Sequence, residues 1–260
     1  IENKTKRETL DELVIARVTD NGPITVLDYG CGKGKISEQL TKQGCSVVGY
    51  DIDTNQIEEN KAIESRVMYV DSEDLFLQSG KYEKVLCCLV LCTIESDQEV
   101  ISVVKDLRKY VDDSGEVIVV ICNPFNTFVK ETETHIKQNI PEAPEYYDKF
   151  SYSKLIKETG NIRKETHRPF SYYEHLFHGE GFQISEITET RSTDVNELAP
   201  ASDFLIIHLK PNPIHSEIDV SLLIKVSAME WRSIDFQIKH IVNQLEGPHR
   251  FKEIIVITDE

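Results

Sequence analysis

The stretch that decides the fold is residues 26–34, which read VLDYGCGKG. Residues 24–29 are a short, mostly apolar run, and glycines follow at positions 30, 32 and 34. Lys35 to Lys42 is predicted to be a helix that ends before Gly44. Glycines between a strand and a helix let the backbone turn sharply and approach a ligand, and the first N–H groups of the helix stay free to bind it. The stretch therefore predicts a ligand site at the first strand-to-helix turn of an α/β sheet.

Two phosphate-binding glycine motifs do not fit this turn. A P-loop requires Ser or Thr after its Lys, whereas Lys33 is followed by Gly34. The dinucleotide motif G-x-G-x-x-G, counted from Gly30, requires a glycine at the position of Lys35. The ligand of this turn is therefore predicted not to be held through a nucleotide phosphate.

Strands and helices alternate along most of the chain. The predicted strands are 24–29, 45–50, 66–70, 84–91, 116–122, 182–187 and 203–209, and the predicted helices are 5–18, 35–42, 54–62, 98–110 and 171–179. This order favours a doubly wound, mostly parallel α/β sheet with right-handed crossovers. Because no helix separates 182–187 from 203–209, these two strands are predicted to form an antiparallel hairpin at the edge of a seven-stranded sheet.

Three segments depart from this alternation. Residues 125–170 lack a clear period and carry many aromatic and charged residues, so we expect an insertion that forms a lid or substrate wall beyond the strand ends. Pro211-Asn212-Pro213 opens a linker, 211–218, which separates a domain of residues 1–210 from an appendage of residues 219–260. The appendage is predicted to be a strand, a helix near Ile234 to Leu245, and a strand, which is too little to bury a core alone.

Composition restricts the class of protein. The 260 residues include 45 acidic and 29 basic side chains, a formal net charge of −16 that disfavours binding to nucleic acid. No apolar run approaches 18 residues, so no membrane span is predicted. Four of the six cysteines (Cys87, Cys88, Cys92 and Cys122) lie in apolar runs, which favours a reduced, cytoplasmic protein. Because position 1 is Ile, the chain is expected to be a fragment of a longer polypeptide.

The D-x-G-x-G-x-G form of residues 28–34 resembles motif I of the class I S-adenosylmethionine (SAM)-dependent methyltransferases, which have a Rossmann-like fold. Five further segments are similar to this family, and they fall in the family's order. They are Asp51 after the second strand, residues 71–75 after the third, residues 82–91 at the fourth, residues 112–117 before the fifth, and Gly181-Phe182 before the terminal hairpin. The resemblance covers residues 10–210.

The resemblance implies SAM as the cofactor and S-adenosylhomocysteine as its product. It assigns Asp28 and the backbone of Gly30–Gly32 to the methionine moiety, and Asp51 to the ribose. It assigns Asp71, Ser72 and Leu89 to the adenine, and it places Tyr29, Cys31 and Ile52 among the cofactor-binding residues. Two alternatives stay open. Asp51 could instead cap the next helix, although Asp53 or Thr54 suits that role better. A neighbouring acidic residue could contact the adenine in place of Asp71.

The acceptor side departs from the family. Cys92-Thr93-Ile94 stands where many small-molecule methyltransferases carry a histidine, and no Asn/Asp-Pro-Pro-aromatic signature of amino-group methylation follows Val90. For a hydroxyl acceptor a base is needed, and His167 leads the candidates because it precedes a helix on the substrate side. Glu174, His175 and His178 share a helix but are interpreted as surface residues, so no metal is predicted.

The appendage suggests an acceptor class. Residues 219–225 and 254–260 resemble the opening of a family 2-type glycosyltransferase, which implies a fused or partner glycosyltransferase domain. We therefore predict SAM-dependent O-methylation of a sugar or another small molecule. One alternative is an RNA or tRNA methyltransferase, which requires a basic stripe near residues 154–168. Another is a non-catalytic SAM-fold module that docks a partner domain.

Overall fold

The structure is a computed structural model, and it describes residues 6–20, 22–72, 75, 80–190 and 202–212, with the backbone of 221–226 and 253–258. The chain divides into two compact units, Ile1–Pro211 and Asn212–Glu260.

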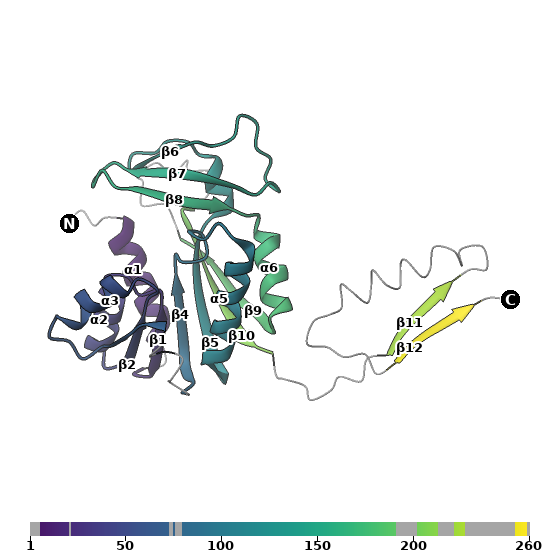
Figure 1. Ribbon diagram of the computed structural model, residues 1–260, viewed down its shortest axis with the longest axis horizontal. Helices are drawn as coiled ribbons and strands as arrows, with labels where there is room; N and C mark the ends of the chain where they lie inside the picture. Colours follow the sequence, from purple (N-terminus) through teal and green to yellow (C-terminus); the bar gives the residue numbers. More distant parts are fainter. Residues whose placement is uncertain are drawn as a thin grey trace. The chain divides into compact units, whose positions relative to one another are not determined.

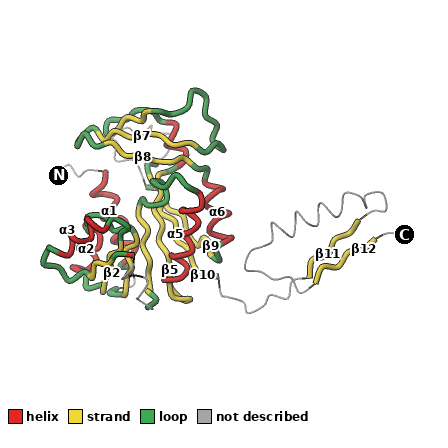
Figure 2. Tube along the Cα trace, in the orientation of Figure 1, coloured by secondary structure: helices red, strands yellow, loops and turns green. Residues whose placement is uncertain are grey.

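The first unit is built on the predicted seven-stranded sheet, with strand order β3-β2-β1-β4-β5-β10-β9 (Figures 1 and 2). Its strands are β1 (Thr25–Tyr29), β2 (Ser46–Tyr50), β3 (Met68–Val70), β4 (Tyr82–Cys88), β5 (Val111–Cys122), β9 (Phe182–Glu189) and β10 (Phe204–Pro211). Strands β1 to β5 pair in parallel, whereas β10 runs antiparallel to both β5 and β9. The fold class and the antiparallel edge hairpin are thus confirmed.

Helices cover both faces of this sheet. They are α1 (Lys6–Val18), α2 (Lys35–Lys42), α3 (Thr54–Lys61), α5 (Asp97–Tyr110) and α6 (Phe170–Gly179). One core cluster joins α1, α2 and α3 to one face, and a second joins α5 and α6 to the other. Neighbouring strand residues fall into different clusters, as with Val26 and Leu27, because successive strand side chains point to opposite faces. The loops that follow the parallel strands therefore lie at one edge, where the two helical layers meet.

Strands β4 and β5 differ from the prediction at their ends. Strand β4 ends at Cys88 rather than residue 91, because Leu89 has a left-handed backbone with φ +60°. Strand β5 begins at Val111 rather than residue 116, since β4 pairs Tyr82 with Val111 and then Lys84 with Glu116. The residues of β5 between these pairs form an irregularity in the ladder rather than a separate turn.

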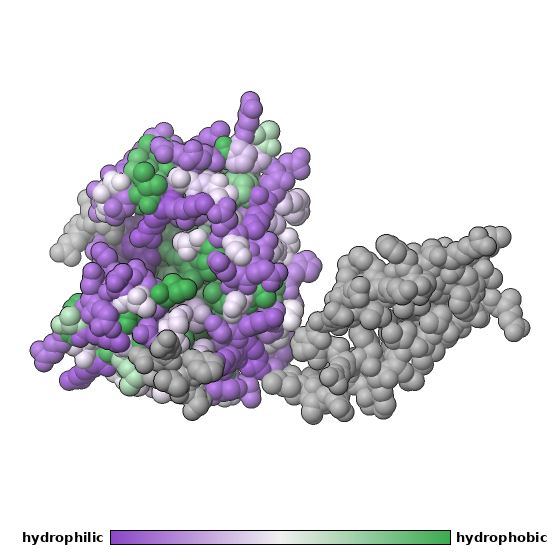
Figure 3. Space-filling model, in the orientation of Figure 1, coloured by the Kyte–Doolittle hydropathy of each residue, from purple (hydrophilic) through white to green (hydrophobic). Residues whose placement is uncertain are grey.

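The insertion, whose sequence lacks a clear period, contains a second sheet. After a 3-10 helix, η1 (Pro124–Phe128), the strands β6 (His135–Gln138), β7 (Phe150–Ile156) and β8 (Ile162–His167) form an antiparallel meander. Figure 1 places this sheet across the end of the main sheet, above β4 and β5. In the space-filling view the surface is hollowed beneath it, with hydrophobic side chains inside (Figure 3). The insertion at residues 125–170 thus contains regular strands, although its sequence shows no clear period, and its role as a lid or substrate wall stays a prediction.

The second unit contains two described strands, β11 (Ser221–Val226) and β12 (Glu253–Thr258), which pair in parallel from Ser221–Glu253 to Val226–Thr258. Both strands were predicted. The expected helix near Ile234 to Leu245 and most of the 211–218 linker lie outside the described residues.

The composition predicted no membrane span and cysteines that lie in the core. None of their helices is long and apolar enough to cross a membrane. Cys87, Cys88 and Cys92 are buried, as expected of core thiols, whereas Cys122 is half-buried.

A buried ion cluster joins β4, β5 and β10. The carboxylate of Glu116 lies 3.3 Å from Lys84 Nζ, 3.2 Å from His208 Nδ1 and 3.4 Å from Lys210 Nζ. Lys84 also contacts Asp20 at 2.6 Å. Burial by itself raises the pKa of Glu116, but the hydrogen bond of His208 and the charges of Lys210 and Lys84 outweigh it and lower the pKa to about 2.

Replacing Glu116 tests this cluster. We expect Glu116→Gln to lower the free energy of unfolding at pH 7 by about 2 kcal/mol, because Lys84 loses one of its two carboxylate partners. The ordinary pKa of Glu is higher than the pKa of about 2 in the folded protein. The stabilising effect is therefore fully present above the ordinary pKa and disappears as the pH falls toward 2.

Urea unfolding at pH 7, 4.5 and 3 measures this difference. The stabilities of the two proteins should converge as the pH falls, whereas a constant difference would contradict the account. Lys210→Gln is the control: the Lys210 side chain is 50% exposed, so its loss should cost less than about 1 kcal/mol.

Candidate functional site

The glycine turn after β1 is fixed by hydrogen bonds to the end of β2. The N–H groups of Gly30 and Cys31 donate to the carbonyl oxygen of Tyr50 at 2.7 and 2.8 Å. Gly30, Gly32 and Gly34 all have left-handed φ values, of +82°, +51° and +68°. The glycines in this motif therefore serve the turn itself, since this backbone conformation is costly for residues with a Cβ.

Each of two glycines in the turn has a distinct role. A Cβ on Gly30 would lie 2.3 Å from Val90 Cγ2, so this position must be glycine for the turn to pack on the segment after β4. A Cβ on Gly32 would have no heavy atom within 4 Å. The backbone at Gly32 therefore faces open space, which a ligand can approach closely.

Asp51, directly after β2, closes the other side of the turn. Its Oδ2 accepts the N–H of Gly32 at 2.8 Å, and its Oδ1 accepts the N–H of Asp53 at 3.0 Å. Asn60 Nδ2 donates to the carbonyl of Gly32 at 2.7 Å. The cap of α3 is Asp53, whose side chain accepts from two backbone N–H groups of the helix, so Asp51 is not used as the cap. A carboxylate has about four lone-pair directions, and Asp51 retains two of them for a ligand.

Asp28 lies beneath the turn and is 2% exposed. Ser37 Oγ donates to its Oδ2 at 2.5 Å. Burial raises the pKa of Asp28 to about 6, although the Ser37 hydrogen bond and the charge of Arg7 oppose the rise. Asp28 is thus a carboxylate that a cationic group in the cavity would readily ionise.

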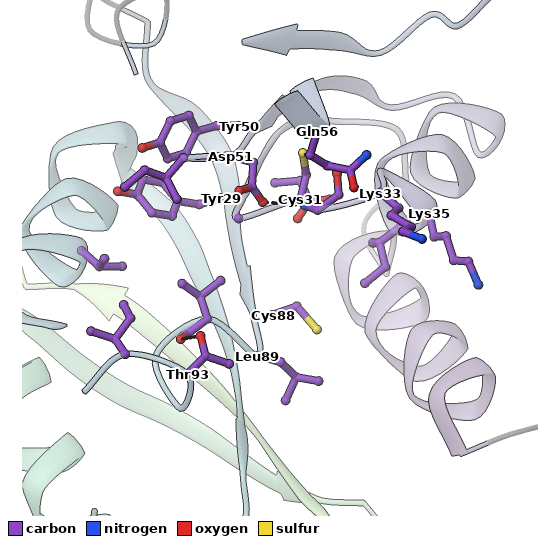
Figure 4. Close-up of a pocket in the computed structure, with 18 of the residues that line it drawn as sticks. Tyr29, Cys31, Lys33, Lys35, Tyr50, Asp51, Gln56, Cys88, Leu89 and Thr93 are labelled. Carbon is purple, nitrogen blue, oxygen red and sulfur yellow. Dashed lines mark hydrogen bonds between the residues drawn. The ribbon is translucent and has the colours of Figure 1, made fainter. Parts of the chain in front are cut away.

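These groups line a cavity of about 890 Å³. Its lining combines α1 (Arg7), the end of β1 and the glycine turn (Asp28 to Lys33), α2 (Lys35, Ile36), the end of β2 and α3 (Tyr50, Asp51, Ile52, Gln56), the segment after β4 (Cys88, Leu89, Val90, Thr93, Ile94), α5 (Glu99, Ser102, Val103, Asp106) and the insertion (Asn161, Arg163). Figure 4 shows Asp51, Cys31 and Gln56 on one side of this cavity, and Cys88, Leu89 and Thr93 on another.

Residues 3–187 match the family described as "Methyltransferase domain". The chain belongs to this methyltransferase family. It is 28% identical over 126 residues to the ubiquinone biosynthesis O-methyltransferase of Rickettsia canadensis, a match that covers 46% of this chain and 52% of the relative. The chain thus spans about half the length of this curated relative.

Solved structures share the fold. A SAM-dependent methyltransferase of Mesorhizobium loti superposes with a TM-score of 0.56 at 16% identity, covering 77% of this chain and 97% of that protein. The magnesium protoporphyrin IX methyltransferase of Synechocystis, solved with bound S-adenosylhomocysteine, superposes with a TM-score of 0.54 at 17% identity, covering 79% and 84%. The predicted family and fold of this methyltransferase are therefore confirmed.

Most cofactor-binding residues predicted from the sequence line one cavity in the methyltransferase. They are Asp28, Tyr29, Gly30, Cys31, Gly32, Asp51, Ile52 and Leu89. Asp71 and Ser72 are not in its lining. Ser72 Oγ lies 3.1 Å from the hydroxyl of Tyr50, which does line the cavity, so Ser72 contacts the wall from behind. Residues 73–74 and 76–79, which follow them, lie outside the described residues.

His167, the predicted base, is not brought to the cavity. It is 1% exposed, and its Nδ1 lies 3.1 Å from Thr127 Oγ1. Its Nε2 lies 2.9 Å from the carbonyl oxygen of Tyr146, and the ring of Phe150 stacks on it. Burial lowers the pKa of His167, partly offset by the Tyr146 carbonyl. Both ring nitrogens contact residues that do not line the cavity. His167 is therefore a packing residue inside the insertion.

The helix with Glu174, His175 and His178 gives no metal centre. Among the described residues, no group of three or more His, Cys, Asp or Glu side chains is arranged to hold a metal ion. His175 Nδ1 lies 2.6 Å from the carbonyl oxygen of Ser171, one turn earlier in α6.

Sequence reasoning missed the walls that come from other segments. The rings of Tyr29 and Tyr50 are tilted against each other with centroids 4.7 Å apart, and the Tyr29 hydroxyl donates to Asp106 of α5 at 2.8 Å. Tyr29 was predicted to bind the cofactor, but no local motif indicates that α5 contributes to the cavity. Arg7, Asn161 and Arg163 were missed for the same reason: their places depend on contacts between distant segments.

The insertion is anchored to the segment after β4, which lines the cavity. The N–H of Thr166 donates to the carbonyl of Cys92 at 2.7 Å. The fully buried Arg168 donates to the carbonyls of Ile94 and Glu95 at 2.8 and 2.9 Å, and to Asp97 Oδ1 at 2.9 Å. A charged donor with three partners in one short segment fixes that segment firmly.

The close contact at Gly30 gives a test of this methyltransferase site. We expect Gly30→Ala to lower the free energy of unfolding by roughly 3 kcal/mol, because it adds a steric conflict with Val90 to the cost of a left-handed backbone. Gly22→Ala is the matched control, since Gly22 has φ +92° and open space around it, and only the backbone cost of about 1–2 kcal/mol applies.

Urea denaturation measures both variants. In the double variant Gly30→Ala/Val90→Ala the conflict is relieved, so substituting Gly30 should cost less in the Val90→Ala background than in the wild type. Equal costs at Gly22 and Gly30 would contradict the role given to Val90.

Proposed function

We propose that this chain is a SAM-dependent O-methyltransferase that acts on a small-molecule acceptor. The observation that carries the proposal is the open backbone at Gly32 between two carboxylates, Asp28 and Asp51, at the end of β1 and β2. Both carboxylates line the same cavity. This arrangement suits a ligand with a cationic end and a pair of hydroxyls, and SAM has both.

The residues of the cavity fit SAM group by group. Asp28 would hold the ammonium of the methionine end, and Arg7, which also lines the cavity, supplies a cation for its carboxylate. Asp51 would accept hydrogen bonds from the two ribose hydroxyls on its remaining lone pairs. Leu89 would contact the adenine. When bound, SAM supplies an electrophilic methyl group on its sulfonium sulfur.

The role of the protein is then mainly to orient the acceptor. Methyl transfer is an in-line displacement, so a wall that fixes the acceptor oxygen against the donor lowers the barrier through positioning. The segment Thr93-Ile94 and helix α5 form this wall, and Arg168 holds the segment in place. The weak similarity to an O-methyltransferase supports oxygen as the acceptor atom.

The finer choices among acceptors rest on other observations. The glycosyltransferase-like appendage favours a sugar hydroxyl, and this acceptor stays a prediction, as does a cytoplasmic location. An RNA acceptor is disfavoured because three lysines of the region that would carry a basic stripe are paired with acids of the protein. Lys154 pairs with Glu165, Lys157 with Glu131, and Lys164 with Glu95. A non-catalytic docking module would bind no donor.

Calorimetry with S-adenosylhomocysteine tests the donor site. We expect Asp51→Ala to weaken binding by about 1.5–3 kcal/mol, roughly 10- to 150-fold, because two ligand hydroxyls lose their acceptor. Asp53→Ala is the control: it removes the cap of α3 and should lower stability by about 1 kcal/mol, but it should leave the affinity unchanged. The absence of binding to the wild-type chain would refute the proposal and favour a non-catalytic module.

The pH dependence of binding tests the role of Asp28. In the free protein this carboxyl is half protonated near pH 6, and an ammonium group beside it favours the ionised form. Binding therefore releases a proton below pH 6, so the affinity should be about tenfold weaker at pH 5 than at pH 7. It should level off above pH 6.5.

Asp28→Asn provides the comparison. This variant should bind S-adenosylhomocysteine more weakly at pH 7, and its affinity should not change between pH 5 and 7. If the wild type and Asp28→Asn show the same pH profile, another group is responsible and Asp28 is not the ammonium partner.

A further inference from the structure

The insertion contributes two side chains to the cavity, Asn161 directly before β8 and Arg163 near the start of that strand. All other lining residues among those described come from the main sheet and its helices. Because the donor site proposed above uses the end of β1 and β2, these two residues belong to the side left for the acceptor. They are therefore the part of the cavity that a particular acceptor would select.

Arg163 lies on the inner face of the insertion sheet. Successive residues of a strand point to opposite faces, so Arg163, Glu165 and His167 share one face of β8. Glu165 and His167 on this face are buried at 5% and 1% exposure. Arg163 lies on the same face, at the end of β8 that is next to the turn from β7. There it is exposed and lines the cavity.

This inner face carries more basic than acidic side chains. Across the ladder Arg163 is directly opposite Lys154 of β7, and like charges at paired positions repel. Glu165 is the carboxylate beside them. Its Oε1 accepts from Lys154 at 3.2 Å and its Oε2 from the hydroxyl of Tyr152 at 2.7 Å. Lys137 of β6 is opposite Lys154 on its other side. Three basic side chains therefore share this face with one carboxylate, and Lys154 is the one that contacts it.

The guanidinium of Arg163 has no ion-pair or hydrogen-bond partner among the described residues. Its neighbours differ in this respect, since Lys164 contacts Glu95 at 2.5 Å and Lys149 contacts Asp97 at 2.9 Å. Four basic side chains among the described residues line the cavity of this chain, whose formal net charge is −16, and Arg163 is the one that comes from the insertion. Arginine presents a planar set of donors that matches the oxygens of a carboxylate or phosphate.

We propose that Arg163 binds a carboxylate or phosphate group of the methyl acceptor, with the amide of Asn161 beside it. The proposal rests on the proposed methyltransferase function. The only anionic group of the donor is its methionine carboxylate, for which Arg7 and Lys33 are available next to the glycine turn. The acceptor is thus an anionic hydroxy compound, and Arg163 determines the specificity for its charge.

Three phenols that differ in one group provide the probes. They are 4-hydroxybenzoate, 4-hydroxyphenyl phosphate and the neutral 4-hydroxybenzamide, titrated into the full chain in the presence of saturating S-adenosylhomocysteine and followed by ligand-observed NMR. We expect at least one anion to bind tenfold or more tightly than the amide, and the better of the two identifies the anionic group. Rising salt should reduce this preference, because Arg163 is exposed.

Variants assign the preference to one side chain. Arg163→Gln should abolish it, and Arg163→Lys should retain part of it. Lys164→Gln is the matched control, since Lys164 is the next residue of the same strand, points to the opposite face and does not line the cavity. It should keep the full preference. All three variants should bind S-adenosylhomocysteine with wild-type affinity.

Several outcomes would overturn the proposal. Equal binding of the three probes, no binding of any of them, or an anion preference that survives in Arg163→Gln would each do so. Failure of the methyltransferase proposal would give a different result. S-adenosylhomocysteine would then not bind to the wild-type chain, whereas the preference of Arg163 for the anionic probes would still be measured without S-adenosylhomocysteine.

Discussion

The hydrogen bond from the N–H of Gly32 to Asp51 Oδ2, 2.8 Å long, is the contact on which the site depends. It ties the turn after β1 to the residue after β2, and it requires these two strands to be neighbours in parallel register, with Tyr29 beside Tyr50. The carbonyl of Tyr50 accepts two more N–H groups of the turn. The shape of the turn is thus set by the adjacent strand as well as by its glycines. The same contact leaves the outer face of Gly32 open and Asp51 with unused lone pairs, so fold and ligand site share one set of bonds.

A second set of contacts joins the insertion to this frame. Thr166 bonds to the carbonyl of Cys92, and Arg168 bonds to the carbonyls of Ile94 and Glu95, in the segment that follows the left-handed Leu89. Strand β8 is therefore fixed at its carboxyl end, next to the main sheet. Its other end carries Asn161 and Arg163 and borders the cavity. The anchored end sets the position of the strand, so residues far from the glycine turn in sequence become part of the same site.

The sequence predicted the parts of the fold whose patterns are local. The seven strands of the main sheet are apolar runs between turns, and motif I names Asp28 and the glycines directly. The strands of the insertion could not be predicted this way, because β7 and β8 are half-exposed and read FSYSKLI and IRKETH, with polar residues on both faces. His167 shows the same limit: its burial follows from contacts with Thr127 and Tyr146, which lie 40 and 21 residues away. A histidine before a helix gives no sign of such partners.

The charge of the protein bears on both substrates. SAM carries a sulfonium and an ammonium against one carboxylate, so it is a net cation, and the field of a chain with net charge −16 attracts it. The transfer removes the sulfonium charge, so the same field holds the product less strongly than the donor. An anionic acceptor meets the opposite situation, since the mean field repels it. Only a local cation that no internal acid neutralises can reverse that repulsion at the cavity. Lys154, Lys157 and Lys164 are paired with acids of the protein, whereas Arg163 faces the cavity without a partner among the described residues.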